Sequence, residues 1–122
     1  MQELKILIVE DEDFVRETLI DYFEMKGYEN ILSVAEGKEA LAIIEQEKPG
    51  LVLLDIQLAD EMDGMQVLKK AKELSSDSKI VMMSAYYNEY AEDAKKDGAY
   101  GFIKKPIVPD KIQDLLKKIQ EV

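Results

Sequence analysis

The sequence predicts an α/β fold in which helices cover both faces of a parallel β-sheet. Five short apolar runs of strand length alternate with segments whose apolar residues recur at helical spacing. This alternation is typical of parallel sheets with right-handed crossover connections. At 122 residues, the chain has the length of one domain. We therefore expect residues 1–122 to form a single α/β domain.

The predicted strands are short and rich in branched apolar residues. They cover residues 4–9, 30–34, 51–54, 79–83 and 100–103. The first, third and fourth of these runs are apolar nearly throughout, as strands are when both of their faces are covered. These three are therefore expected in the interior of the sheet.

Each strand is followed by a segment with helical periodicity. The apolar positions of these segments fall within residues 15–23, 40–44, 67–74, 91–94 and 112–119.

Glycine and proline mark several of the helix ends. Gly27 and Gly98 follow the first and fourth helical segments, where glycine commonly ends a helix. Pro109 stands where the last helix is expected to begin. The acidic stretch LADEMDG, residues 58–64, is the longest predicted loop between a strand and a helix.

Composition and charge exclude several functional classes. Lys and Arg total 16 against 26 Asp and Glu, and the net charge of −10 opposes binding to nucleic acid or anionic lipid. The absence of Cys and His excludes disulfides, thiolate or imidazole metal sites and Ser-His-Asp triads. A bound metal must then be a hard, oxygen-ligated cation. No signal peptide or membrane-spanning stretch is visible, so a cytoplasmic protein with no membrane insertion is expected.

Polar residues follow four of the predicted strands. Glu10 and Asp11 follow the first strand, Asp55 the third and Ser84 the fourth, while Lys105 follows the fifth by one residue. Ligands of open parallel sheets bind beyond the carboxyl ends of the strands. We therefore expect these side chains to gather at one edge of the sheet.

Carboxylates held close together repel one another unless a cation lies between them. Mg²⁺ prefers oxygen ligands and commonly joins one or two carboxylates to a phosphate. An aspartate can attack phosphorus and form an aspartyl-phosphate, while a lysine and a hydroxyl neutralise the phosphoryl oxygens. The sequence contains a candidate for each of these roles.

Each residue alone has a simpler interpretation. Asp11 alone is more often a helix N-cap, and Asp55 or Ser84 alone a loop, turn or cap residue. A lysine followed by proline, as at Lys105 and Pro106, is usually a surface turn. It is their joint placement at strand ends that favours a functional site.

The chain resembles the response regulator receiver domain of two-component signalling (CheY-like). The resemblance lies in ILIVEDE, in LVLLDIQL with MDG, in MMSAY and in GAYGFIKKP, and it covers nearly the whole chain. It implies a flavodoxin-like, doubly wound sheet of five parallel strands in the order 2-1-3-4-5, with five helices in three α/β/α layers.

By this resemblance, Asp55 is the phosphoacceptor. Asp11 is implied as a direct Mg²⁺ ligand, and Glu10 as its acidic neighbour acting through water. Asp55 and the backbone carbonyl of Gln57 are implied as further metal ligands. Gln57 and Tyr86 stand where receiver domains tune the lifetime of the phosphoryl group.

The resemblance also assigns residues to phosphoryl binding and switching. Lys105 matches the family's lysine, whereas its neighbour Lys104 has no such role. Ser84 corresponds to the switch hydroxyl and Phe102 to the switch aromatic residue. The bond between Lys105 and Pro106 is implied to be cis.

Two features depart from the family pattern. Ala59 stands where a proline is usual, and residues 58–64 contain one extra residue, so the pattern does not predict this loop's conformation. Phe102 lacks the hydroxyl that many switch aromatics carry, which leaves a change of rotamer as its way to signal.

The function implied is that of a phosphoacceptor rather than a dedicated enzyme. A sensor histidine kinase or phosphotransfer protein would donate the phosphoryl group, and a downstream effector protein would read the altered surface, where Tyr87 and Tyr90 are candidates beside Phe102. The alternative is an interaction module of the same fold that works without phosphorylation. A phosphatase of the haloacid dehalogenase type is disfavoured, because Gln57 replaces the required second aspartate.

Overall fold

The computed structural model describes residues 4–120, which form five strands and five helices in strict alternation. The strands are β1 (Ile6–Val9), β2 (Ile31–Val34), β3 (Leu51–Asp55), β4 (Lys79–Ser84) and β5 (Gly101–Lys104). The helices are α1 (Asp13–Met25), α2 (Gly37–Glu47), α3 (Gly64–Leu74), α4 (Tyr87–Lys96) and α5 (Pro109–Gln120).

The strands form one parallel sheet in the order β2-β1-β3-β4-β5, which confirms the predicted fold class. The interior strands β1, β3 and β4 are those with nearly continuous apolar sequences, and β1 and β3 are buried throughout. Edge strand β2 is only partly buried. The order places β1 directly beside β3, so that Val9 pairs with Leu54 at the carboxyl ends of the two strands.

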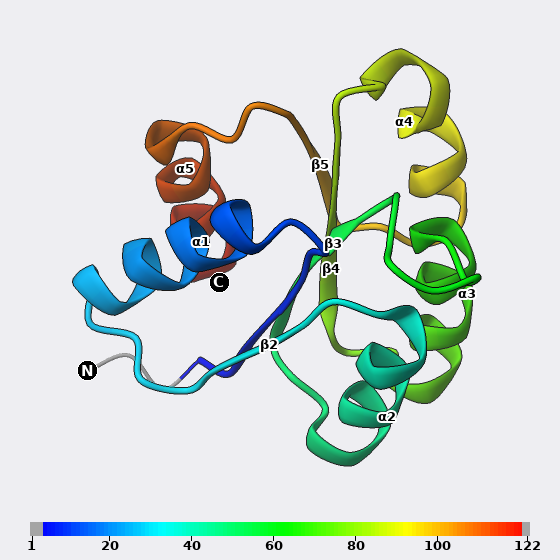
Figure 1. Ribbon diagram of the computed structural model, residues 1–122, viewed down its shortest axis with the longest axis horizontal. Helices are drawn as coiled ribbons and strands as arrows, with labels where there is room; N and C mark the ends of the chain where they lie inside the picture. Colours follow the sequence, from blue (N-terminus) through cyan, green and yellow to red (C-terminus); the bar gives the residue numbers. More distant parts are fainter. Residues whose placement is uncertain (1–3, 121–122) are drawn as a thin grey trace.

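Helices cover the two faces of the sheet and create two apolar cores (Figure 1). On one face α1 and α5 pack against alternate strand residues such as Ile8, Leu53 and Val81. On the other face α2, α3 and α4 pack against the intervening residues, among them Leu7 and Val52. The residues that the structure describes include no helix with the length and hydrophobicity to cross a bilayer.

The predicted element boundaries are close to the observed ones. Gly27 and Gly98 have φ values of 93° and 100° after α1 and α4, a conformation that glycine adopts without strain. Pro109 is the first residue of α5. β3, β4 and β5 each extend one residue beyond the predicted run, because Asp55, Ser84 and Lys104 still belong to the sheet despite their polar side chains.

The loop between β3 and α3 is closed at its base by close backbone packing. The Gly64 amide donates to the Ile56 carbonyl at 2.6 Å. A Cβ atom on Gly64 would overlap the backbone of Asp55 and Ile56, so only glycine fits there. Asp63 then caps α3 through a reciprocal pair of hydrogen bonds with Gln66.

Candidate functional site

Three carboxylates meet at the carboxyl edge of the sheet. Glu10 follows β1 directly, Asp11 comes next, and Asp55 is the last residue of β3. Each offers an oxygen, and these three atoms lie within 4.8 Å of one another. Glu10 and Asp55 are buried, whereas Asp11 is exposed. Because β1 and β3 are neighbours in register, two segments far apart in the sequence contribute to one acidic cluster.

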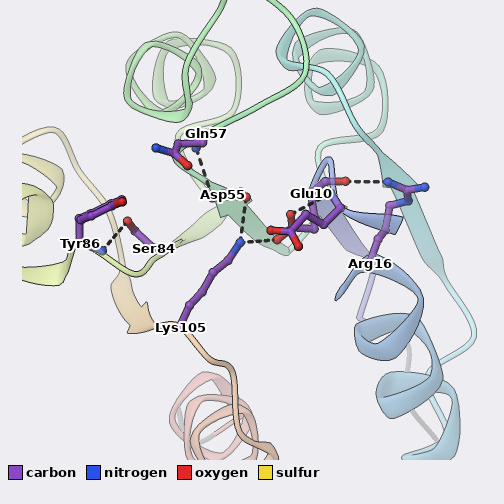
Figure 2. A network of polar contacts seen from close by, with 8 residues as sticks. Glu10, Arg16, Asp55, Gln57, Ser84, Tyr86 and Lys105 are labelled. Carbon is purple, nitrogen blue, oxygen red and sulfur yellow. Dashed lines mark hydrogen bonds and ion pairs between the residues drawn. The ribbon is translucent and has the colours of Figure 1, made fainter. Parts of the chain in front are cut away.

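Lys105 enters this cluster from the far side of β4. Its Nζ lies 2.9 Å from Asp55 Oδ2 and 2.8 Å from Glu10 Oε1. Figure 2 shows the side chain extending from the end of β5 toward both carboxylates. One ammonium therefore bridges two buried acids, which reduces the cost of placing them side by side.

The backbone around the acids is held by further hydrogen bonds. The amides of Glu12 and Gln57 donate to the carboxylates of Glu10 and Asp55, at 3.1 and 3.2 Å. Arg16 Nη1 donates to the Glu10 carbonyl at 2.8 Å (Figure 2). Its Nη2 forms an ion pair with Asp13. These contacts fix the loop that carries Glu10 and Asp11.

The charges of the cluster depend on one another. Burial raises the pKa of Glu10, the hydrogen bond from Lys105 opposes that rise, and the negative charge of Asp55 adds to it, so that the pKa reaches about 7. For Lys105, burial lowers the pKa, but the hydrogen bonds to Glu10 and Asp55 outweigh burial and raise it. The lysine thus stays charged while Glu10 is close to half-protonated at neutral pH.

The cluster fits a hard cation by its donor chemistry. Among the described residues, the Lys105 ammonium at 2.8 Å is the one partner of the buried Glu10 Oε1. Asp11 and Asp55 each offer a further carboxylate oxygen, and the resemblance adds the backbone carbonyl of Gln57. Such an all-oxygen set is the one that Mg²⁺ prefers.

The predicted hydroxyl lies on the same edge of the sheet. Ser84 is buried, and its Oγ accepts a hydrogen bond from the Tyr86 amide at 2.9 Å (Figure 2). The Ser84 carbonyl accepts from the Lys105 amide at 2.9 Å. Ser84 therefore links the start of α4 to the backbone of the lysine that contacts the acids.

Two predicted residues lie outside the acidic cluster. Phe102 is half-buried in β5, and its ring packs edge-on against Tyr87 with centroids 5.1 Å apart. The Lys105–Pro106 peptide bond is cis, the isomer that the resemblance implies.

Several of the simpler interpretations are wrong for this fold. The N-cap of α1 is Glu12, not Asp11, and Asp55 is a buried strand residue rather than a solvated loop residue. Ser84 does make the turn hydrogen bond expected of such a residue, through Tyr86. Sequence reasoning missed Arg16, whose contact with the Glu10 carbonyl has no signature in the sequence.

Comparisons with known proteins find relatives that match nearly the whole chain. The chain is 36% identical over 119 residues to sporulation initiation phosphotransferase F of Bacillus subtilis, covering 97% of this chain and 94% of that protein. It is 33% identical to the chemotaxis protein CheY of the same species over 115 residues, 93% of this chain and 95% of that protein.

Solved structures give the same result. A CheY-like response regulator receiver domain protein from Methanospirillum hungatei superposes with a TM-score of 0.89 at 33% identity, with 98% of this chain and 96% of that chain covered. The family model of the response regulator receiver domain matches residues 6–117. The chain belongs to the response regulator receiver domain family.

Proposed function

We propose that this receiver domain accepts a phosphoryl group on Asp55 in the presence of Mg²⁺ and thereby switches a partner-binding surface. The observation that carries the proposal is the convergence of Glu10, Asp11 and Asp55 with the ammonium of Lys105. An ordinary structural ion pair needs no third carboxylate beside two buried acids that already share one ammonium.

Each residue has a defined task in this proposal. Glu10, Asp11, Asp55 and the Gln57 carbonyl would hold the ion, which when bound neutralises the phosphoryl oxygens during transfer. Lys105 already contacts Asp55 and would follow the added charge onto a phosphoryl oxygen. Ser84 would donate a hydrogen bond from its hydroxyl to another phosphoryl oxygen. The turn of Oγ toward that oxygen would break the hydrogen bond that it now accepts from the Tyr86 amide.

The transfer is a displacement at phosphorus. A carboxylate oxygen of Asp55 forms the new P–O bond while the P–N bond of a phosphohistidine breaks. The electron pair of that bond stays on the imidazole nitrogen, which then takes up a proton. Since this chain has no histidine, the donor must be another protein.

The donor we propose is a sensor histidine kinase or a phosphotransfer protein. It must reach Asp55 at the edge of the sheet, where an apolar hollow of about 220 Å³ borders Lys105 and Pro106. Phe14, 81% exposed, lies at the rim of this hollow and offers the donor an apolar contact.

The effector would bind the surface around Tyr87 and Phe102. Phosphotransfer from purified kinases of the source organism identifies the donor.

The central test uses a small phosphodonor. We expect intact-mass spectrometry to detect one phosphoryl group, about 80 Da, after incubation with acetyl phosphate and Mg²⁺. Asp55→Asn should gain none, because an amide cannot act as the nucleophile. Chelation of Mg²⁺ should suppress the adduct in the wild type.

Asp77→Asn is a matched control, because it removes an exposed carboxylate from the turn before β4, at the opposite end of the sheet from the cluster. It should be phosphorylated like the wild type. An unmodified wild type would support the alternative interaction module that works without phosphate. An adduct that persists in Asp55→Asn would show that another residue is the phosphoacceptor.

A further inference from the structure

Helix α2 begins without a cap of its own. Its N-cap residue, Glu36, makes no side-chain hydrogen bond to the first turn. Asp60, from the loop between β3 and α3, takes that role: its Oδ1 accepts from the Gly37 amide at 2.9 Å and its Oδ2 from the Lys38 amide at 3.1 Å. The Ala59 amide adds a backbone bond to the Ala35 carbonyl at 3.3 Å. The loop is thus attached to α2 at its tip.

The packing beneath this attachment is specific to the two segments. Gly37 is buried, and a Cβ atom there would lie 2.8 Å from Val67 Cγ2 and 3.2 Å from Met62. The absence of a side chain lets the loop and α3 approach the first turn of α2. The hydrogen bond from the Gly37 amide, joined by that from Lys38, lowers the pKa of Asp60. The carboxylate is therefore ionised at neutral pH, in the form that a helix N-terminus favours.

The same loop carries Gln57, the residue beside the acidic cluster. At its base the loop is fixed where the Gly64 amide meets the Ile56 carbonyl, and the Gln57 amide donates to Asp55 Oδ1. Leu58 packs against the core on this face of the sheet, and the other hydrogen bonds of residues 57–61 to the described part of the chain are those of Ala59 to Ala35 and of Asp60 to the first turn of α2. The backbone of Gln57 therefore lies between two fixed points, with Asp60 three residues further along the chain.

We propose that Asp60 is a positioning residue that holds the backbone of Gln57 in place beside the acidic cluster. Both of its carboxylate oxygens are bonded to α2, so it acts as an anchor and not as a metal ligand. The proposal rests on the proposed function, because it assigns the Gln57 carbonyl to the metal site. The proposal also gives a role to the loop of residues 58–64, which has one residue more than the family pattern and in which Asp60 reaches α2.

The test compares the wild type with Asp60→Ala and Asp60→Asn. In metal-free protein, hydrogen exchange should speed up by about tenfold at the amides of Gly37, Lys38 and Gln57 in Asp60→Ala. Mg²⁺ affinity, measured by NMR titration, should fall by about tenfold, at the mild end of what loss of a supporting contact costs a metal site. Asp60→Asn should lie between the two, because one amide oxygen replaces two carboxylate oxygens.

Ser78→Ala serves as a control for general loss of stability. It removes a buried hydroxyl that donates to the Pro49 carbonyl. Ser78 directly precedes β4, at the end of the sheet opposite to the acidic cluster. It should lower the melting temperature and leave Mg²⁺ affinity unchanged. Faster exchange at Gly37 and Lys38 without a change at Gln57 or in Mg²⁺ affinity would reduce Asp60 to a helix cap and overturn the proposal.

Failure of the proposed function gives a different result. If the wild type neither binds Mg²⁺ nor gains a phosphoryl group from acetyl phosphate, both proposals fall together. If the wild type does both and Asp60→Ala keeps its Mg²⁺ affinity, only the anchoring role is lost.

Discussion

The residues of the acidic cluster are held close to an electrostatic balance. Glu10 and Asp55 are buried, and both pair with the single ammonium of Lys105. Removing one partner from a buried ion pair is costly, because it leaves an uncompensated charge. Here two acids share one base, so a proton on Glu10 and a divalent cation are competing ways to neutralise the remaining charge.

A pH dependence of stability follows from Glu10. Its pKa is raised by burial from 4.5 to about 7, so the folded protein binds a proton that the unfolded chain has lost. The stabilisation is fully present below the unfolded pKa and is lost as pH rises through the folded value. Without metal, the free energy of unfolding relative to Glu10→Gln should therefore fall by roughly 2 kcal/mol between these two pH values.

Urea unfolding of both proteins over that pH range, in chelator, measures this difference. The comparison with Glu10→Gln cancels the pH-dependent contributions that other carboxylates make to the free energy of unfolding. The lowered pKa of Asp60, for example, makes the protein more stable as pH rises. Parallel pH profiles for the two proteins would mean that Glu10 titrates normally. Saturating Mg²⁺ should remove most of the loss near pH 7, because the bound cation neutralises the ionised carboxylates of the folded wild type.

At the scale of single residues, the sequence could predict the positions of residues that follow strands. It could not predict side chains whose hydrogen bonds join a loop to a neighbouring element. Asp55 and Lys105 were predictable, because strand ends in a parallel sheet share one edge. The bonds of Asp60 to α2 and of Arg16 to the Glu10 carbonyl depend on how two loops fold onto neighbouring elements. No periodicity encodes such contacts.

At the scale of elements, the loop from β3 to α3 depends on one glycine. The Gly64 amide binds the Ile56 carbonyl, and a side chain at this position would overlap the backbone of Asp55. The phosphoacceptor proposed here and the start of α3 are therefore packed against each other through backbone atoms. A side chain at position 64 must therefore displace either the backbone of Asp55 or the start of α3.

Gly64→Ala should be strongly destabilising, by about 3 kcal/mol, because backbone cannot move aside as a flexible side chain can. Gly101→Ala is a matched control: the nearest atom to its Cβ would be Val81 Cγ2 at 3.9 Å, an ordinary contact. It should change stability by less than about 1 kcal/mol. Chemical denaturation of both variants measures the difference, and equal losses would contradict the packing described for Gly64.

The elements themselves were largely predictable, for physical reasons. Strands such as β1 and β3 are buried on both faces, so their apolar runs stand out from the amphipathic helices between them. Strand ends were less clear, since Asp55 and Ser84 are polar residues held within the sheet by the site they form. The conformation of residues 58–64 could not be predicted, because it follows from contacts with α2.

At the scale of the whole molecule, the strand order determines which strands and helices are in contact with the site and would respond to phosphorylation of Asp55. β1 and β3 supply the acids, β5 supplies Lys105, and β4 lies between them with Ser84 at its end. Ser84 contacts both neighbours of the site, since its Oγ accepts from the Tyr86 amide and its carbonyl from the Lys105 amide. The route away from the site therefore leads to α4 and β5.

Phosphorylation should move the start of α4 and leave the opposite end of the sheet unchanged. When the Ser84 hydroxyl turns to donate to a new phosphoryl group, its Oγ moves away from the Tyr86 amide, and the Tyr87 ring, which packs on Phe102, is displaced. In amide NMR spectra recorded with acetyl phosphate and Mg²⁺, we expect large shifts at Tyr86, Tyr87 and Phe102. The amides of Ser75 and Ser78 should not shift, because these residues lie beyond the far end of β4 from Ser84, where their hydroxyls are hydrogen-bonded to each other.

Two variants separate this route from a general rearrangement. Asp55→Asn should show no response to acetyl phosphate at any of these amides. Ser84→Ala already lacks the acceptor of the Tyr86 amide, so its Tyr86 signal should start displaced and respond little once Asp55 is phosphorylated. A full response at Tyr86 and Phe102 in phosphorylated Ser84→Ala would show that the change reaches α4 without this hydroxyl. Lys105 would then be the remaining direct link between Asp55 and β5.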